Sequence, residues 1–262
     1  MVRPQSNYKR LQRFFRGFDL DYKAIGKIVV SWMQIPEPWI LSNDRTTWEL
    51  GKHCYNILTL GIVHQGVAFP VLWWILDQKG NSNSDERMRF IEEFCQIFPD
   101  ARISFVCGDR EFVGQAWVRY LLLEPSMAFR LRIRATDRIE RNGVSLAARV
   151  VFAHLQKGQS QRLKGFCRVW GCPVSVEALR LDDGKLLVVI SPDASEELVK
   201  DYASRWGIET LFGIFKTRGF CLESTQMTVP ERKRKLFALL TLALCWSMLT
   251  GKRTSSVSTY SH

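Results

Sequence analysis

The chain has 262 residues, of which 46% are hydrophobic and 24% are charged, so it can form one large domain or two small ones and lacks the composition of a disordered protein. It has 37 Lys and Arg against 26 Asp and Glu, and the net charge of +11 favours a polyanionic partner, either nucleic acid or an anionic membrane surface. Its 7 cysteines include no CxxC pair, which argues against structural zinc and a disulfide framework and favours a reducing cytoplasm.

The first half of the chain predicts alternating helices and strands. Apolar residues near helical spacing predict a helix over 8–33, which Pro36 and Pro38 then end. A short strand is expected from Trp39 to about Asp44, and two later apolar runs joined by His64-Gln65-Gly66 predict a β-hairpin. The other elements expected here are the hairpin strands 57–63 and 67–76, a helix over 85–98 and a buried strand over 103–107.

The second half contains most of the excess positive charge. Residues 130–168 include ten Lys and Arg and two acids, so this stretch holds +8 of the net +11. Phe, Leu and Ile alternate with Arg130, Arg132 and Arg134, which predicts a strand with one apolar and one cationic face. The other expected elements are helices over 113–123, 195–217 and 230–249 and a strand over 186–190. This order predicts a mixed α/β fold around one central sheet.

Three acidic residues occupy positions where ligands are commonly bound. Asp44 is expected to end the first strand, Asp109 follows the strand over 103–107, and Glu209 lies in a late helix. Groups at strand ends line the crevice of an open α/β sheet, and carboxylates converging there form a hard oxygen site that suits Mg²⁺. Two such ions about 3.5–4 Å apart support in-line phosphoryl transfer. The alternative is that the aspartates cap turns and Glu209 is a solvated helix residue.

The late helix places a carboxylate between cations. With about 100° per residue, Tyr202, Arg205, Glu209 and Lys216 fall within roughly 60° of one another, beside an apolar face. Arg and Lys suit the oxygens of phosphate groups, Arg as a planar fork and Lys as a point charge. The pattern therefore indicates an acidic site lined by phosphate-binding side chains.

These residues carry a resemblance to a known family. The spacing Tyr202-x2-Arg205-x3-Glu209-x6-Lys216 is similar to the Tyr-Arg-Glu-Lys signature of the IS-four family of bacterial insertion-sequence transposases, which are DDE enzymes with an RNase H-like fold. The similarity runs from about residue 8 to residue 249. Its other segments are 41–48 around the first Asp, 108–112 around the second, and Gly80-Asn81-Ser82 between them.

The resemblance implies roles for individual residues. Asp44, Asp109 and Glu209 would be catalytic and hold Mg²⁺, for which Mn²⁺ would substitute. Tyr202, Arg205 and Lys216 would grip the phosphates next to the transposon end. The further basic side chains expected to contact DNA are Arg110, Arg130, Arg132 and Arg134.

The resemblance also implies an RNase H-like mixed sheet, flanked by helices and interrupted by a β-rich insertion before the last catalytic helix. The expected organisation is a short helical N-terminal segment 1–38, a first part of the catalytic core 39–133, a basic β-rich insertion 134–185, a second part of the core with the Glu209 helix 186–218, and a C-terminal helix and tail 219–262. Trp170 in the insertion would either stack on a flipped base or pack in the core.

The implied function is cut-and-paste transposition of an insertion sequence, by metal-dependent end cleavage and strand transfer. The expected partners are the double-stranded DNA of transposon ends and target, and a second copy of the chain in a paired-end complex. No membrane association is expected. The expected location is the bacterial cytoplasm, in association with the nucleoid.

Two other functions stay open. Members of the resembling family carry a longer DNA-binding region before the first Asp, whereas 43 residues precede Asp44 here, so a non-catalytic DNA-binding remnant of a transposase is the main alternative. The basic run Arg232-Lys233-Arg234-Lys235 opens the last helix, where the helix dipole disfavours cations, and this indicates a phosphate partner. Together with the apolar stretch 236–249, it would also suit a peripheral membrane protein.

Overall fold

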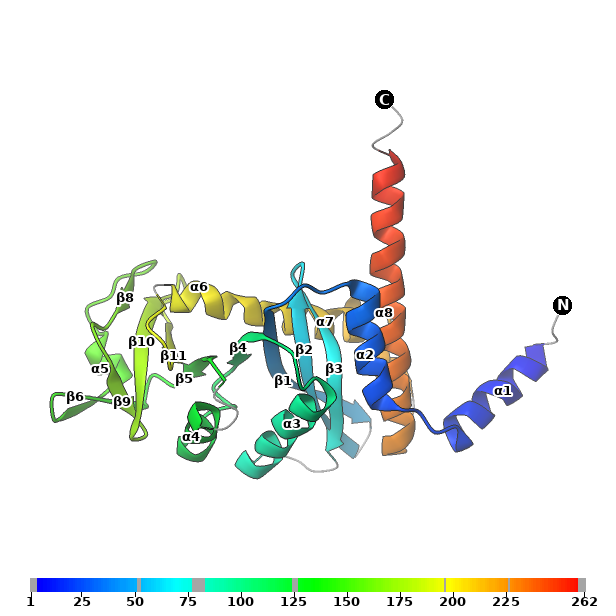
Figure 1. The fold of residues 1–262 in the computed structure, drawn as a ribbon, viewed down its shortest axis with the longest axis horizontal. Helices are drawn as coiled ribbons and strands as arrows, with labels where there is room; N and C mark the ends of the chain where they lie inside the picture. The colour runs from blue at the N-terminus through cyan, green and yellow to red at the C-terminus, as the bar shows by residue number, and fades with distance from the viewer. Residues whose placement is uncertain are drawn as a thin grey trace.

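One large mixed sheet runs through the protein. The structure is a computed structural model that describes residues 4–50, 53–76, 83–123, 127–195, 197–225 and 227–258. Its strands follow the order β3-β2-β1-β4-β5-β11-β10-β9-β6-β7, and β8 pairs with β10 beside this path. Helices cover both faces of the sheet, and the C-terminal part of the last helix projects from the body (Figure 1). The expected mixed α/β architecture is confirmed.

The first five strands have an RNase H-like arrangement. They are β1 (Trp39–Leu50), β2 (His53–His64), β3 (Val67–Leu76), β4 (Ile103–Gly108) and β5 (Phe129–Ile133). The strands β1, β2 and β3 form an antiparallel meander, whereas β4 runs parallel to β1 and β5 parallel to β4. The predicted hairpin turn joins β2 to β3, and both Gln65 and Gly66 have positive φ, as a two-residue turn between twisted strands requires.

Two layers of helix enclose these strands. On one face lie α3 (Ser84–Ile97) and α4 (Gln115–Leu123), close to the predicted helices. Asn83 and Glu86 begin α3 with reciprocal side-chain to backbone hydrogen bonds. The opposite face carries the late helix (Figure 1), which changes type along its length. Its parts are α6 (Leu198–Tyr202), a 3-10 turn η1 (Ala203–Arg205), α7 (Trp206–Gly213) and a π-helical turn η2 (Ile214–Arg218).

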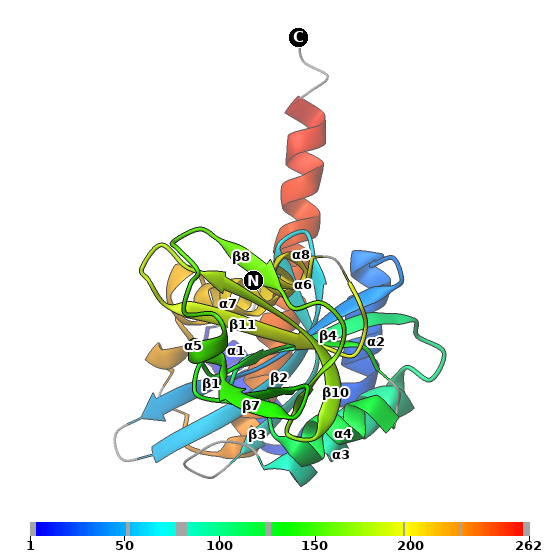
Figure 2. The ribbon, with the colours of Figure 1, turned by 90° about the vertical axis from the view of Figure 1, so that its left-hand side faces the viewer.

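The stretch between β5 and the late helix is rich in short strands. It contains β6 (Arg138–Arg141), β7 (Val144–Ala147), α5 (Ala148–Val151), β8 (Ser160–Arg162), β9 (Cys167–Val169), β10 (Cys172–Arg180) and β11 (Leu186–Ser191). Because β11 pairs antiparallel with β5, this stretch continues the central sheet (Figure 2). Trp170 lies in the β9–β10 turn with φ 49° and packs partly buried against the core, as one of its two readings expects.

The N-terminal segment differs from the single predicted helix. It forms α1 (Pro4–Gly17) and α2 (Tyr22–Met33), because the Asp21 side chain accepts a hydrogen bond from the Ala24 backbone and caps a new helix. Gly26 of α2 packs so closely on β3 that a Cβ would lie 2.4 Å from the Val71 carbonyl oxygen. Of these two helices, α1 extends away from the body and α2 lies against it (Figure 1).

The last helix, α8 (Pro230–Ser258), follows a 3-10 turn η3 (Leu222–Ser224) and buries part of its basic start. Lys233 is fully buried, with its ammonium 3.2 Å from the Tyr55 ring centroid and 4.5 Å from that of Trp48. Arg234 lies 3.9 Å over the Tyr22 ring. The interpretation of this run as a phosphate-binding surface is therefore wrong for Lys233, because aromatic side chains enclose its charge.

Among the described residues, one helical stretch, Pro230–Gly251, is long and apolar enough to cross a bilayer. In its most apolar part, 39% is buried inside the protein. The same properties occur in core helices of globular proteins. Here Phe237, Ala238 and Cys245 are fully buried, as in a core helix.

Candidate active site

The two aspartates meet where β1 and β4 stop pairing. The parallel register ends at Asn43 opposite Gly108, so Asp44 and Asp109 are the next residues on the two neighbouring chains. The expectation that Asp44 ends its strand is wrong, because β1 continues to Leu50 as the antiparallel partner of β2. Asp109 nevertheless directly follows the end of the neighbouring strand β4, where groups in an open α/β sheet line a crevice, and Asp44 lies beside it.

Arg205 links the first aspartate to the late helix. Its Nη1 donates to Asp44 Oδ2 over 3.0 Å, and its Nη2 donates to the Glu209 carboxylate. The Arg205 side chain is only 8% exposed, and its Nε is buried with no acceptor among the described residues. Close packing brings the helix here, because a Cβ on Gly207 would lie 3.1 Å from the Ala68 backbone nitrogen of β3.

Tyr202 and Arg132 approach the second aspartate. The Tyr202 hydroxyl donates to Asp109 Oδ1 over 3.4 Å, and Arg132 Nη1 lies 3.6 Å from the same oxygen. The backbone N–H of Arg110 also donates to Asp109 Oδ1, over 2.7 Å. Among the described residues, no group donates a hydrogen bond to Asp109 Oδ2, which leaves this oxygen able to accept a ligand.

Lys216 is the last of the four residues that helical spacing predicts on one side of the late helix. Its ammonium donates to the Thr47 carbonyl oxygen on β1. The structure thus brings Tyr202, Arg205 and Lys216, together with Glu209, to the edge where β1 and β4 carry their aspartates. The helical periodicity survives the 3-10 and π-helical turns because the backbone from α6 to η2 stays right-handed helical.

Burial and charge set the protonation of this cluster. Burial raises the pKa of Asp44 to about 6, although Arg205 and the Arg45 backbone N–H favour its ionised form, and Asp109 and Glu111 raise it further. Burial likewise raises the pKa of the Tyr202 hydroxyl. Burial opposes the charge of Arg205, but Tyr202, Asp44 and Glu209 outweigh that cost and raise its pKa above the usual value.

The donor set fits a hard divalent cation in its chemistry. Asp44, Asp109 and Glu209 supply carboxylate oxygens from three different elements and contribute no sulfur or nitrogen, which suits Mg²⁺ or Mn²⁺. At present Arg205 supplies the positive charge between Asp44 and Glu209. Within the described ranges, no three His, Cys, Asp or Glu side chains are arranged so that they could hold an ion together. Metal binding at these acids therefore requires Arg205 to release at least one of them.

A second ion pair beside the cluster was not anticipated from the sequence. Arg45 Nη2 donates to Glu111 Oε2 over 3.0 Å, and Arg45 Nη1 donates to Asn56 Oδ1 over 3.0 Å. Arg45 directly follows Asp44, and Glu111 lies two residues after Asp109, so each aspartate is followed by a member of this pair. The Asp109-Arg110-Glu111 triplet was the available signal, but the cross-strand partner of Glu111 cannot be read from spacing.

The four predicted DNA-contacting arginines have different environments. Arg110 and Arg134 are exposed and Arg132 is partly buried. Arg130 is 5% exposed, with Nη1 3.0 Å from Asp193 and Nε 2.9 Å from Asp201. The expectation of a free cationic face is therefore wrong at Arg130, because the loop after β11 and helix α6 cover that side of β5.

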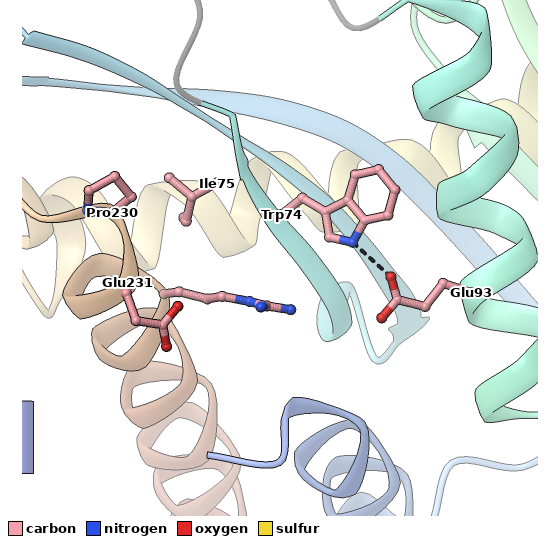
Figure 3. A pocket seen from close by; sticks show the side chains of 6 residues that line it. Trp74, Ile75, Glu93, Pro230 and Glu231 are labelled. Atoms are coloured by element: carbon pink, nitrogen blue, oxygen red, sulfur yellow. Dashed lines mark hydrogen bonds between the residues drawn. The ribbon is translucent and has the colours of Figure 1, made fainter. Parts of the chain in front are cut away.

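A separate cavity of about 440 Å³ lies between β3, α3 and the start of α8 (Figure 3). Trp74 Nε1 donates to Glu93 Oε2 over 2.8 Å inside it, and the Tyr22 hydroxyl donates to Glu231 Oε1 over 2.6 Å. Both carboxylates of this cavity thus accept hydrogen bonds from other elements of the fold.

The expected family segment Gly80-Asn81-Ser82 lies outside the described residues.

Comparison with known proteins places the chain in a family. The family model described as transposase DDE domain matches residues 36–246. The chain belongs to the DDE transposases. No curated protein sequence matches it.

Three solved structures are similar to this DDE transposase domain at low identity. A piggyBac transposase, in a cryo-EM synaptic complex with hairpin DNA, is 13% identical with a TM-score of 0.48, covering 93% of this chain and 61% of that one. Endonuclease V from Bacillus subtilis is 11% identical, with a TM-score of 0.34 and coverage of 94% and 95%. The NurA nuclease from Sulfolobus solfataricus is 11% identical, with a TM-score of 0.31 and coverage of 98% of both chains.

Proposed function

We propose that this DDE transposase cuts and joins DNA by metal-dependent phosphoryl transfer, with Asp44, Asp109 and Glu209 as its catalytic carboxylates. One observation carries the proposal: Arg205 and Tyr202 contact three acids, which come from β1, from the residue after β4 and from α7. These contacts lie together at the carboxyl-terminal end of β4. These acids are far apart in sequence, and no fold requirement calls for three carboxylates at one edge. A shared cation-binding role accounts for their convergence.

The residues of this chain have distinct roles in the proposed reaction. Divalent metal on the carboxylates would supply Lewis-acid activation of water or a 3′-hydroxyl and stabilise the leaving oxygen. Arg205, once it releases an acid, has three nitrogens for the non-bridging oxygens of a phosphate, including the buried Nε. Tyr202 positions Asp109 through its hydroxyl, and Lys216 adds a point charge beside β1.

The finer assignment follows the Tyr-Arg-Glu-Lys spacing. We assign the chain to the IS-four branch, and we propose that it excises its insertion sequence by cut-and-paste transposition. Two transposon ends must be cut and joined together, so we propose a homodimer on paired double-stranded DNA ends and target DNA. The proposed location is the bacterial cytoplasm, in association with the nucleoid and without membrane attachment.

The test uses DNA that carries the sequences flanking the gene, incubated with the full chain and Mg²⁺ or Mn²⁺. The expected result is cleavage at an inverted repeat followed by strand transfer. Glu209→Ala should abolish both while DNA binding stays measurable. Cleavage by Glu209→Ala at the wild-type rate would rule out its role as a catalytic carboxylate.

One observation favours a second candidate, a non-catalytic DNA-binding remnant. Arg205 pairs with both Asp44 and Glu209, so its guanidinium occupies the place between these two acids. A remnant would bind DNA and show no cleavage with either metal ion. The same incubation therefore separates the two functions.

A further inference from the structure

A cavity of about 460 Å³ lies next to the carboxylates, and all the charged residues that line it are basic. Six of its lining residues are Lys or Arg, and none is Asp or Glu. They come from the turn after β4, the end of β5, helix α5 and the β10–β11 turn. These six residues, the cationic pocket, are Arg110, Arg132, Arg134, Arg149, Arg180 and Lys185.

The walls of the cationic pocket are held in place by the fold. Arg180 donates to the carbonyl oxygens of Phe152 and Gly184 over 3.1 and 3.2 Å, so its guanidinium joins α5 to the β10–β11 turn. The Arg149 backbone N–H donates to the Ala135 carbonyl oxygen over 2.8 Å, which fixes the start of α5 against the end of β5. The positive charges therefore converge before any ligand arrives.

Most of this charge lacks a carboxylate partner. Arg110, Arg134 and Arg149 are exposed, and none forms an ion pair with a residue in the described ranges. Lys185 pairs with Asp183 over 2.7 Å, but its side chain is 74% exposed and the pair is weak in water. Like charges gathered around a cavity repel one another, and this arrangement is favourable when anions occupy it.

The cationic pocket is continuous with the carboxylate site. Arg132 lines the pocket and also reaches within 3.6 Å of Asp109 Oδ1, and Arg110 is the residue directly after Asp109. A nucleic-acid strand with its reacting phosphate at Asp109 would thus carry its neighbouring phosphates into the pocket. Arg forks match the paired oxygens of such groups.

We propose that the cationic pocket binds backbone phosphates of the DNA strand next to the reacting phosphate, with Arg149 and Arg134 as contacts. The inference rests on the proposed function, because it assumes a DNA strand at the carboxylates. It adds a binding site formed jointly by the core and by the β-rich stretch 134–185, in which Arg149 had no expected role.

The experiment measures how DNA affinity depends on salt for the full chain and a short DNA duplex. Arg149→Ala should lower the slope of log affinity against log salt by about 0.9, the value for one lost phosphate contact. Between about 50 and 200 mM salt this makes the loss of affinity about 3.5-fold smaller than in wild type. The double variant Arg134→Ala/Arg149→Ala should lower the slope by about 1.8.

Two controls separate a phosphate contact from general charge or misfolding. Arg89→Ala removes one exposed cation from α3, away from the pocket, and should keep the wild-type slope. Arg149→Lys keeps the charge and should restore most of the slope. Thermal unfolding of each variant verifies folding.

The outcomes distinguish the two proposals. If wild-type affinity shows no salt dependence and no cleavage occurs, the proposed function fails. If wild type binds and cleaves DNA but Arg149→Ala has the slope of Arg89→Ala, the pocket inference alone is overturned. Saturable binding of inorganic phosphate that depends on Arg149, with an unchanged DNA slope, would assign the pocket to a free phosphate compound and overturn it too.

Discussion

Two buried arginines, Arg130 and Arg205, each bridge a pair of carboxylates on the same side of the sheet. Their side chains are 6% and 8% exposed. Arg130 joins Asp193 to Asp201 and also donates to the Ser191 hydroxyl and the Phe129 carbonyl oxygen. Arg205 joins Asp44 to Glu209, and its Nε has no acceptor in the described part of the chain.

The surroundings of the carboxylates differ more than the arginines do. Arg130 contacts acids that belong to one loop and one helix: its Nε holds α6 through Asp201, and its Nη1 holds the end of β11 and the loop after it through Ser191 and Asp193. Glu209 beside Arg205 is as exposed as Asp193 beside Arg130, at 42% and 44%, but around Arg205 a third carboxylate, Asp109, lies nearby. The same ion-pair chemistry therefore joins elements of the fold in one place, and in the other it holds the acids that we propose as metal ligands.

The largest expected effect is on catalysis. Asp109→Asn removes the charge of an acid whose Oδ2 is open, and it should lower the rate of DNA cleavage by about a thousandfold or more, since a lost metal contact costs several kcal/mol of transition-state stabilisation. The measurement is single-turnover cleavage with Mn²⁺. Glu197→Gln, at the exposed residue just before α6, is the control and should cleave at the wild-type rate. Equal rates for Asp109→Asn and the control would contradict the account.

The next effect concerns stability and separates the two arginines. Arg130→Ala removes hydrogen bonds to Asp193, Asp201, the Ser191 hydroxyl and the Phe129 carbonyl oxygen, and should lower the free energy of unfolding by about 3–5 kcal/mol. Arg205→Ala should cost less, because the Arg205 guanidinium hydrogen-bonds to two acids and its Nε has no acceptor among the described residues. Urea unfolding of both variants checks this order. A larger loss for Arg205→Ala would mean that the Arg205 cluster is the main structural clamp.

Asp44 gives a pH dependence of moderate size. Its folded-state pKa of about 6 lies above the ordinary value of 3.8, so the folded state binds the extra proton and this contribution to stability is lost as pH rises through 6. Asp44→Asn should therefore gain stability relative to wild type between pH 4 and pH 7, by at most about 3 kcal/mol. Urea unfolding in metal-free buffer at each pH measures the difference. A difference that stays constant with pH would show that Asp44 is ionised in the fold throughout.

The smallest expected effect is on the alkylation of Cys107, the thiol two residues before Asp109. Burial raises the pKa of the Cys107 thiol to about 12, and the side chain is fully buried, whereas Cys221 is exposed. Iodoacetamide near neutral pH should thus alkylate Cys221 and leave Cys107 unmodified until the protein unfolds. Mass spectrometry identifies the labelled peptides. Rapid labelling of Cys107 in the folded protein would show that the packing behind Asp109 is looser than described.

The sequence predicts the arrangement of residues along the late helix better than it predicts what surrounds them. The stripe of Tyr202, Arg205 and Glu209 could be found because helical periodicity depends only on local backbone geometry. The end of β1 was misplaced because its antiparallel partner β2 prolongs it beyond Asp44. Such pairing is a long-range property that the alternation of one strand does not show.

The wrong predictions for two buried cations, Arg130 and Lys233, have the same cause. Alternation along β5 correctly separates Arg130 from the apolar positions, but it does not show that Asp193 and Asp201 cover it. Lys233 looks like a surface lysine at a helix start until Trp48 and Tyr55 enclose it. The position of Arg205 between two acids likewise depends on how α7 packs over β1, which spacing alone does not determine.

Binding of Mn²⁺ to the full chain with duplex DNA, measured by calorimetry, tests the central claim most directly. If Asp44, Asp109 and Glu209 form one cation site, the variant Asp44→Asn/Asp109→Asn/Glu209→Gln loses Mn²⁺ binding, whereas Glu197→Gln binds it like wild type. Mn²⁺ affinity in the folded triple variant equal to that of wild type would contradict the claim.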